Sequence, residues 1–420
     1  MATRTPAPPV TNPIPIRSVS NWYIAAIGLA QFGIFVAILA PVIVSMQLKA
    51  QELNPGNPAS VVAVALSIGS IGAILGNPLF GALSDRTRTR WGRRRPWLLG
   101  GIVFLLVGLA AVALSKNVLT LTLSWLLCQL ASNAAFAALM ASFADNVPES
   151  QRGRASSVLG LAQNIAILAG IYAAALLVAN LPLLFIVPGV VGVACVVVYV
   201  LVTPDRIPET PMESFSVMAI VRAFWTNPVK HPDFGLAWAS RFMIVLAMFL
   251  FTTFRLFYMQ DHLGLTEERA VSAVATGVLL YTIALMASAA LSGWLSDRLA
   301  RRKIFVAGST LLFGIGLVVL VYADTVAHFY IAEIVMGLAY GVYTAVDNAL
   351  VIDVLPDPGK PGKDLGVLNI ANSLPQSFAP ALGALLLGLG GGDNYPALLW
   401  CAGIVALIGA AVIIPIRGVR

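Results

Sequence analysis

The sequence predicts an all-α membrane protein in which twelve transmembrane helices form two pseudo-symmetric six-helix bundles. Three observations lead to this fold class. The 420 residues are 59% hydrophobic and 11% charged, whereas soluble globular proteins are roughly 45–50% apolar and about 25% charged. The apolar residues fall in long continuous runs. The two halves of the chain also carry a repeated motif.

The apolar runs are long enough for helices that cross a bilayer, which takes about 20 residues. Their hydrophobic residues are continuous rather than alternating, so they predict helices and not barrel strands. The first run is too long for a signal-peptide core of roughly 7–15 residues and is interpreted as a retained span. The predicted spans cover residues 22–48, 60–83, 97–115, 118–145, 153–179, 182–202, 236–260, 269–296, 303–322, 326–355, 366–388 and 396–416.

The spans divide into two halves. Residues 1–21, rich in proline and polar side chains, predict a disordered cytoplasmic tail, and residues 203–235 predict a cytoplasmic linker between bundles at residues 22–202 and 236–420. The segment Gly81-Ala-Leu-Ser-Asp-Arg86 recurs as Gly293-Trp-Leu-Ser-Asp-Arg298, and "SVLGLAQN" in span five resembles "GVLNIAN" in span eleven. Two repeated six-helix halves are the organisation of many secondary transporters.

Lysine and arginine are distributed unevenly over the predicted loops. With the N-terminus inside, 21 of the 26 basic residues fall in cytoplasmic segments, and three (Lys49, Lys116 and Arg269) fall outside. Because basic residues accumulate on the cytoplasmic side of membrane proteins, both termini are predicted in the cytoplasm and the chain in the cell membrane. The same distribution accounts for the net charge of +7, so no nucleic-acid partner is needed to explain it.

Several motifs of soluble enzymes and pumps are missing from the sequence. It has neither HExxH nor GxxxxGK[ST], and its three cysteines lie singly in apolar runs. This argues against a zinc hydrolase and a self-contained ATP-driven pump. We therefore predict no enzyme activity, no metal site and no cofactor. The expected partners of a monomeric chain are a small-molecule substrate, a proton as the candidate coupling ion, and the lipid bilayer.

The arginine-rich loops carry the most specific motif. "GALSDRTRTRWGRRR" and "GWLSDRLARRK" resemble the signature after the second and eighth helices of the major facilitator superfamily. The tendency of basic residues to keep a loop in the cytoplasm explains most of the arginines. It does not explain Asp85 and Asp297, because acidic residues contribute little to membrane orientation. The resemblance implies that each aspartate meets a helix N-terminus of the opposite half, where a carboxylate gains about 0.3–1 kcal/mol. The implied cytoplasmic gate comprises Gly81, Asp85, Arg86, Gly92, Arg93, Arg94, Gly293, Asp297 and Arg298.

A narrower resemblance covers most of the first half and span eleven. "AQFGIFVAILAPV", "RWGRRRPW" and "LGVLNIANSLPQ" are similar to segments of the plant sucrose/proton symporters and of the glycoside–pentoside–hexuronide:cation symporters. This resemblance implies a sugar or glycoside as substrate. One departure concerns coupling, because the sucrose symporters carry an aspartate in span four where Gln129 stands here. Spans one and two also contain no acid, although melibiose-type relatives bind a cation there.

Four charged residues within predicted spans stand out as candidates, because a charge there costs at least a few kcal/mol unless it meets a partner or a cavity. Arg241, near the cytoplasmic end of span seven, is interpreted as snorkelling or pairing with a headgroup. Arg255 and Glu333 lie at similar depth near outer ends, so an ion pair and a substrate role are both open. Asp347 lies about 9 Å inside the membrane, counted from Asp353 at about 1.5 Å per residue.

Asp347 has no basic residue one helical turn away. A buried carboxylate without a partner can carry a proton, so Asp347 and Glu333 are the candidates for proton coupling. The alternative for Asp347 is a structural hydrogen bond or a salt bridge across helices.

Uncharged amides in the spans are candidates for substrate binding. Amides both donate and accept hydrogen bonds, which suits sugar hydroxyls, although they also join membrane helices at about 0.6 kcal/mol per bond. Gln31, Gln129 and Asn133 are favoured, because the resemblance implies that spans one and four line the central cavity. The candidate set is Gln31, Asn77, Gln129, Asn133, Gln163, Asn372 and Arg255.

Three functions fit these observations. The favoured one is a secondary active transporter that works by alternating access, carries a sugar or glycoside and is a candidate for proton coupling. The transport alternatives are a uniporter without proton coupling and an exporter of hydrophobic drugs or metabolites. A membrane sensor or scaffold that does not transport is less favoured, because a static scaffold has no need of duplicated gate motifs.

Overall fold

The structure is a computed structural model that describes residues 18–205, 227–299, 301–356 and 361–416. Helices without any strand make up the fold of these residues, as the fold class predicts. Most of the predicted tail, residues 1–21, and most of the predicted linker, residues 203–235, lie outside the described residues.

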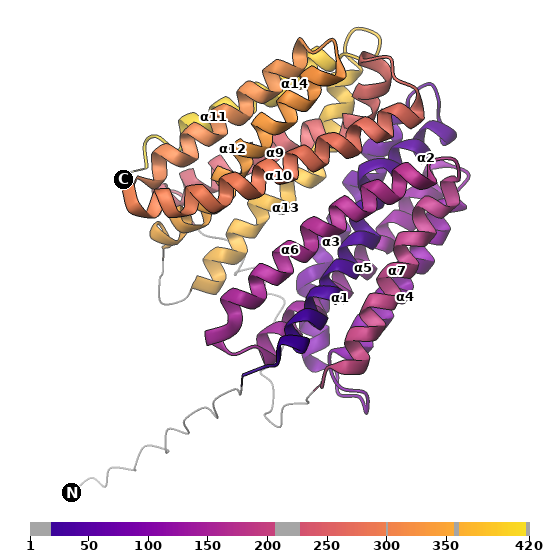
Figure 1. Cartoon of the computed structure of the whole chain (residues 1–420), viewed down its shortest axis with the longest axis vertical. Helices are drawn as coiled ribbons and strands as arrows, with labels where there is room; N and C mark the ends of the chain where they lie inside the picture. The colour runs from indigo at the N-terminus through magenta and orange to yellow at the C-terminus, as the bar shows by residue number, and fades with distance from the viewer. Residues whose placement is uncertain (1–17, 206–226, 300, 357–360, 417–420) are drawn as a thin grey trace, which may run out of the picture.

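The first bundle, indigo to magenta in Figure 1, contains the six predicted crossings of the N-terminal half. Its first crossing is continuous but changes helix type twice. The elements are α1 (Asn21–Ala40), η1 (a π-helix, Pro41–Ser45), α2 (Met46–Leu53), α3 (Pro58–Arg86), α4 (Arg95–Ala113), α5 (Val118–Asn146), α6 (Glu149–Leu177) and α7 (Leu181–Val202).

The second bundle, red to yellow in Figure 1, repeats this plan. Its first crossing also contains a π-helical turn, which here lies at the end of the crossing. The elements are α9 (Pro232–Phe257), η2 (Tyr258–His262), α10 (Glu267–Leu299), α11 (Arg302–Val321), α12 (Val326–Asp353), α13 (Pro361–Leu387) and α14 (Tyr395–Val412). Eleven crossings in the described part of the chain are long and apolar enough to span a membrane. The remaining long helix, α13, carries two prolines in its interior and three amides.

Asparagine side chains start several helices. The side-chain oxygens of Asn57, Asn117, Asn180 and Asn394 accept the backbone N–H three residues later, at the first turns of α3, α5, α7 and α14. Such caps satisfy a backbone donor that has no partner inside the helix. The caps therefore fix the short connections between crossings.

The two bundles pack their helices in the same pattern. In the first, α1 packs against α6 and α7, and α5 packs against α3 and α4. In the second, α9 packs against α13 and α14, and α12 packs against α10 and α11. The repeated motif of the sequence therefore corresponds to a repeated arrangement of helices, and the prediction of two pseudo-symmetric bundles is confirmed.

Small residues bring the helices of a bundle close together. A Cβ atom on Gly101 of α4 would lie 2.7 Å from the backbone nitrogen of Ala135 in α5, and one on Gly192 of α7 would lie 2.7 Å from the carbonyl oxygen of Gly33 in α1. Such close approach through glycine is typical of membrane helix packing.

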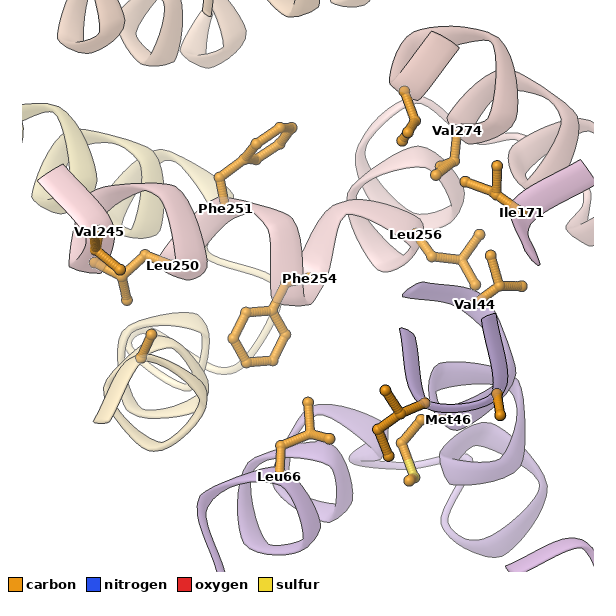
Figure 2. Packing of buried hydrophobic residues seen from close by; sticks show 14 of the residues in the cluster. Val44, Met46, Leu66, Ile171, Val245, Leu250, Phe251, Phe254, Leu256 and Val274 are labelled. Carbon is orange, nitrogen blue, oxygen red and sulfur yellow. The ribbon is translucent and has the colours of Figure 1, made fainter. Parts of the chain in front are cut away.

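The bundles meet at one end and diverge toward the other (Figure 1). We call the end that carries η1 and η2 the contact end, and the end that carries residues 86–95 the basic end. Across the bundles, α3 packs on α13, α6 packs on α10, and η1 and α2 touch α9. Figure 2 shows the buried apolar side chains at this junction, with Leu256 directed toward Val44 and Val274 toward Ile171.

Candidate functional site

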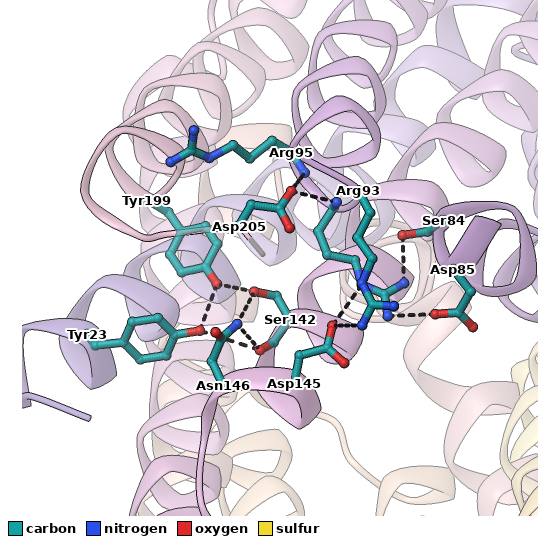
Figure 3. Close-up of polar contacts among 11 residues, drawn as sticks. Tyr23, Ser84, Asp85, Arg93, Arg95, Ser142, Asp145, Asn146, Tyr199 and Asp205 are labelled. Carbon is teal, nitrogen blue, oxygen red and sulfur yellow. Dashed lines mark hydrogen bonds and ion pairs between the residues drawn. The ribbon is translucent and has the colours of Figure 1, made fainter. Parts of the chain in front are cut away.

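Arg94 is the centre of a polar network at the basic end of the first bundle. Figure 3 labels its partners Ser84, Asp85 and Asp145. The Arg94 guanidinium donates to the Ser84 hydroxyl at 2.9 Å, and it pairs with Asp85 at 2.6 Å and with Asp145 at 3.1 Å. Arg93 reaches the same oxygen of Asp145 at 2.6 Å. Both arginine side chains are buried, so they hold α3, α4 and α5 together.

Asp205 extends this network to the chain segment after α7. Its carboxylate accepts the backbone N–H groups of Arg94 and Arg95 at 2.7 and 2.9 Å, which places a negative charge at the start of α4, where the helix dipole favours it. Gly92 has φ of +108° and packs its Cα side against this carboxylate, so a larger residue would be strained there and would clash.

Sequence reasoning did not select Asp145 and Asp205, because nothing local marks an acid as the partner of a distant arginine. The positive φ of Gly92 shows why the motif needs glycine at that position.

Six of the nine predicted gate residues belong to the first bundle, and the other three belong to α10 of the second. Asp85 has a side chain that is 50% exposed, and its ion pair is with Arg94 of its own bundle. A Cβ on Gly81 would meet nothing within 4 Å. Gly293, Asp297 and Arg298 lie in the last turns of α10, where Arg298 is exposed. The surroundings of Gly293 and the side chain of Asp297 lie outside what the structure describes.

Polar contacts close the contact end. The Gln47 amide of α2 donates to the carbonyl oxygen of Thr253 in α9 at 3.0 Å, and the Gln51 amide donates to the side chain of Gln260 in η2 at 2.6 Å. These bonds connect the two π-helical crossings of opposite bundles, and they stand beside the apolar contacts of Figure 2. The contact end is therefore shut in this conformation.

Two ion pairs connect α9 with α12 inside the second bundle. Arg241 binds Asp347 through its Nε at 2.6 Å and also through its Nη2. The predicted snorkelling of Arg241 is wrong, because its side chain is buried and paired. Asp347 makes the salt bridge across helices that stood as its alternative, although its Oδ1 atom has no hydrogen-bond partner among the described residues.

The second pair joins Arg255 to Glu333, with Nη1 3.2 Å from Oε1. Of the two roles left open for these residues, the ion pair is present. Arg255 follows Arg241 by 14 positions on α9, and Glu333 precedes Asp347 by 14 positions on α12. Because these helices are antiparallel, the pairs lie about 21 Å apart along the bundle, at about 1.5 Å per residue.

The amides predicted on the central helices lie in different environments. Gln31 of α1 is 4% exposed, and its side-chain oxygen has no hydrogen-bond partner among the described residues. Gln129 and Asn133 of α5 are half-buried, and the Asn133 amide donates to the Gln129 carbonyl at 2.9 Å. Asn77 of α3 is also half-buried.

The remaining amides form matched faces on α6 and α13. Asn369, Asn372, Ser373 and Gln376 fall within an arc of about 100° on α13, at about 100° per residue. Asn369 and Gln376 are exposed and the other two half-exposed. Gln163 and Asn164 take the equivalent positions on α6, where both are half-exposed. The structure therefore places Gln163 and Asn372 in corresponding positions of the two bundles.

Comparison with known families gives a match over most of the chain. The sequence model described as Major Facilitator Superfamily matches residues 22–292 and 270–419. Among solved structures, that of a nucleoside transporter NupG variant has a TM-score of 0.76 over 94% of this chain and 99% of that chain, at 11% sequence identity. This likeness shows the fold alone.

Curated relatives match over shorter stretches. An uncharacterized symporter of Synechocystis is 44% identical over 78 residues, 19% of this chain and 14% of the relative. A D-xylose transporter of Levilactobacillus brevis is 32% identical over 149 residues, 35% of this chain and 30% of the relative. A multidrug resistance protein B homolog of Mycobacterium tuberculosis is 29% identical over 135 residues, 32% of this chain and 25% of the relative. The alignments thus cover less than a third of each relative.

Proposed function

Because the chain belongs to the major facilitator superfamily, we propose that it is a secondary active transporter that carries a sugar or glycoside by alternating access. The observation that carries the proposal is the asymmetric junction between the bundles. Side chains of both bundles close the contact end, whereas Asp85 at the basic end is half-exposed and paired within its own bundle. In this conformation, a substrate reaches the centre from the basic end.

The orientation in the membrane follows from charge. The basic end carries the arginine-rich segment 86–95, and such segments stay in the cytoplasm. The conformation is therefore inward-facing, in a multi-pass protein of the cell membrane with both termini inside. When the bundles rock to the outward-facing state, Asp85 and Asp297 would meet the opposite bundle and close the basic end.

The polar faces of α6 and α13 support a polyhydroxylated substrate. An amide exposed to lipid is costly because the bilayer offers no hydrogen-bond partner, so we place the faces of Gln163 and Asn372 toward the space between the bundles. Gln31, whose buried oxygen has no partner, and Gln129 with Asn133 would complete the site from α1 and α5. Amides suit hydroxyl groups because they donate and accept.

Proton coupling would reside in the second bundle. Gln129 cannot ionise, but Asp347 is buried, paired with Arg241 and able to lose its charge by taking up a proton. Protonation would release Arg241, whose charge would then need another partner because an unpaired buried charge is costly. The Arg241–Asp347 pair therefore links proton uptake to a rearrangement of α9 against α12.

Export of hydrophobic compounds is the second candidate. The observation in its favour is the relative from Mycobacterium tuberculosis, which is named a multidrug resistance protein homolog. The ion pairs of α9 and α12 also leave few net charges in the interior.

Counterflow in proteoliposomes tests these functions. The full chain is reconstituted, and the exchange of labelled D-xylose and sucrose is measured with and without an imposed pH gradient. We expect sugar exchange, and accumulation when the outside is acidic. Sugar flux that ignores pH would indicate a uniporter. Flux of a hydrophobic dye without sugar flux would favour export, and absence of any flux would contradict transport.

A further inference from the structure

Two neighbouring polar residues repeat at the same place in the two bundles. Gln163 and Asn164 of α6 align with Asn372 and Ser373 of α13 when "SVLGLAQN" is placed over "GVLNIAN" and the residue that follows it. All four side chains are half-exposed, so each offers part of its surface to a ligand. We call Gln163 with Asn164 the first dyad and Asn372 with Ser373 the second dyad.

The two dyads point away from the lipid. The exposed apolar residues Leu161, Ile165 and Leu176 form one stripe on α6, and the middle of the first dyad lies about 140° from it, at about 100° per residue. On α13, Phe378 and Leu385 are exposed, and the second dyad lies about 180° from them. Helix α6 packs on α10 and α13 packs on α3, both of the opposite bundle. The dyads therefore border the space between the bundles.

The second member of each dyad uses a hydrogen to bond its own helix. The Asn164 amide donates to the Gly160 carbonyl at 3.0 Å, and the Ser373 hydroxyl donates to the Asn369 carbonyl at 2.9 Å. A backbone carbonyl only accepts, so the nitrogen of Asn164 must lie against its own helix, and its oxygen is turned outward. Ser373 has one hydrogen, which this bond takes, so it offers a ligand only its lone pairs.

The first member of each dyad differs, because the amides of Gln163 and Asn372 are not committed to a carbonyl of their own helix. A ligand hydroxyl can accept from these amides, but it must donate to Asn164 and Ser373. Turning the N–H of Asn164 or the O–H of Ser373 toward the ligand would give up the bond to the helix carbonyl. Each dyad is therefore a donor beside an acceptor.

This arrangement selects the chemistry of the ligand. A hydroxyl group both accepts and donates, so neighbouring hydroxyls of a polyol satisfy both members of a dyad. A carboxylate has no hydrogen to donate and would meet the lone pairs of Asn164 and Ser373. An ammonium group would donate, but neither dyad contains an acid, and Asp347 and Glu333 are paired with arginines. The ligand that fits is neutral.

We infer that Asn164 and Ser373 determine specificity by accepting hydrogens from two hydroxyl groups of a neutral sugar, an inference that rests on the proposed sugar transport. Because one dyad belongs to each bundle, the sugar is held from both sides. A sugar hydroxyl that is replaced by fluorine has no hydrogen to donate, and it should bind less well at these residues although the fluorine still accepts weakly.

The first test compares side chains of equal shape at position 373. Ser373→Thr keeps the hydroxyl, whereas Ser373→Val has a methyl group in its place. In D-xylose counterflow by the full chain in proteoliposomes, Ser373→Thr should keep the wild-type KM and Ser373→Val should raise it about two- to tenfold, the effect of one lost hydrogen bond. Thr310→Val is the matched control, because the Thr310 hydroxyl also donates to the carbonyl four residues earlier, at 2.8 Å, but is buried on α11. It should leave KM unchanged.

The second test establishes the direction of the hydrogen bond. Deoxyfluoro analogues of D-xylose, each with one hydroxyl replaced by fluorine, compete with labelled D-xylose for exchange. With the wild type, the analogue altered at the hydroxyl that Ser373 accepts from should compete about two- to tenfold more weakly than D-xylose. It should lose this disadvantage with Ser373→Val, because the side chain and the hydroxyl act as a coupled pair. Asn164→Leu should remove the disadvantage of a different analogue.

Two results would overturn the inference while leaving the proposed transport in place. One is the same KM for Ser373→Thr and Ser373→Val, and the other is fluorinated analogues that all compete as well as D-xylose, each with sugar exchange by the wild type intact. If the wild type exchanges no neutral sugar, the proposed substrate class fails and the inference with it.

Discussion

Charged side chains inside the second bundle are held in pairs that cross from α9 to α12. Arg241 with Asp347 and Arg255 with Glu333 are all buried, and each partner offsets a charge whose isolated burial would cost far more than the pair. The first bundle places its buried arginines, Arg93 and Arg94, at the basic end instead. We therefore expect substitutions in the two bundles to affect different steps of transport.

The Asp347→Asn variant tests the coupling role of this carboxylate. Asparagine cannot take up a proton, so proton-driven accumulation should be lost while sugar exchange persists. Because Arg241 then stays buried without a counter-charge, the variant should also unfold more easily, by about 3–5 kcal/mol. Accumulation and exchange in proteoliposomes, with thermal unfolding of the purified chain, measure both effects.

Glu268→Gln is the matched control, because Glu268 lies exposed in the first turn of α10. It should leave accumulation and stability unchanged. Normal accumulation by Asp347→Asn would make the Arg241–Asp347 pair structural and would move the search for a coupling acid to Glu333.

At the scale of the helices, glycine positions decide how closely neighbours approach. Gly100 and Gly101 are adjacent on α4 but differ in their surroundings. A Cβ on Gly101 would lie 2.7 Å from the nitrogen of Ala135 and 2.8 Å from the carbonyl oxygen of Ala131, whereas one on Gly100 would meet nothing within 4 Å. Alanine substitutions at Gly100 and Gly101 therefore change helix propensity alike, but only the one at Gly101 disturbs the packing of α4 against α5.

We expect Gly101→Ala to destabilise the chain by about 1–3 kcal/mol, because α4 must shift away from α5. Gly100→Ala should stabilise the chain by about 0.5–1 kcal/mol, which is the difference in helix propensity between glycine and alanine. Thermal unfolding in detergent compares them. Equal effects of the two substitutions would contradict the close contact between α4 and α5.

At the scale of the whole molecule, the two bundles meet at the contact end. The contact end combines apolar packing with two amide hydrogen bonds, from Gln47 to Thr253 and from Gln51 to Gln260. Both π-helical turns lie at this junction, and such turns occur frequently at functional sites. Opening this end requires these contacts to separate.

Cross-linking across the junction should therefore stop transport. Cysteines replace Gln51 and Gln260 in a Cys401→Ala background and are joined by a short bis-methanethiosulfonate reagent, which forms a reducible disulfide with each cysteine. The linker is needed because two glutamine side chains span more than a direct disulfide can. We expect sugar counterflow to be lost and then restored by reduction. Counterflow is the measurement.

A cross-link within one bundle provides the control. The side chain of Arg154 in α6 donates to that of Asn21 in α1 at 2.9 Å, and both residues belong to the first bundle. Joining them through cysteines should leave counterflow intact. Persistent transport with the contact end locked would mean that the bundles do not rock about this junction.

Much of the fold is predictable from the chain itself, because it depends on local properties. Continuous apolar runs indicate the spans, and the repeat of Gly81–Arg86 at Gly293–Arg298 indicates two halves. The candidate site is predictable only in part. Arg255 with Glu333 could be anticipated from their similar depth, but Arg241 was assigned to the membrane surface because its partner Asp347 lies 106 positions away.

The sequence by itself determined the membrane class, the number of crossings, the duplicated halves and the residue types available for function. These follow from hydrophobicity and charge, which act on each segment independently. Only the tertiary structure decided which charges neutralise one another, that Asp205 caps α4, and which end of the molecule is shut. Those features depend on contacts between helices distant in sequence, and a side chain acquires its partner only when the helices are placed together.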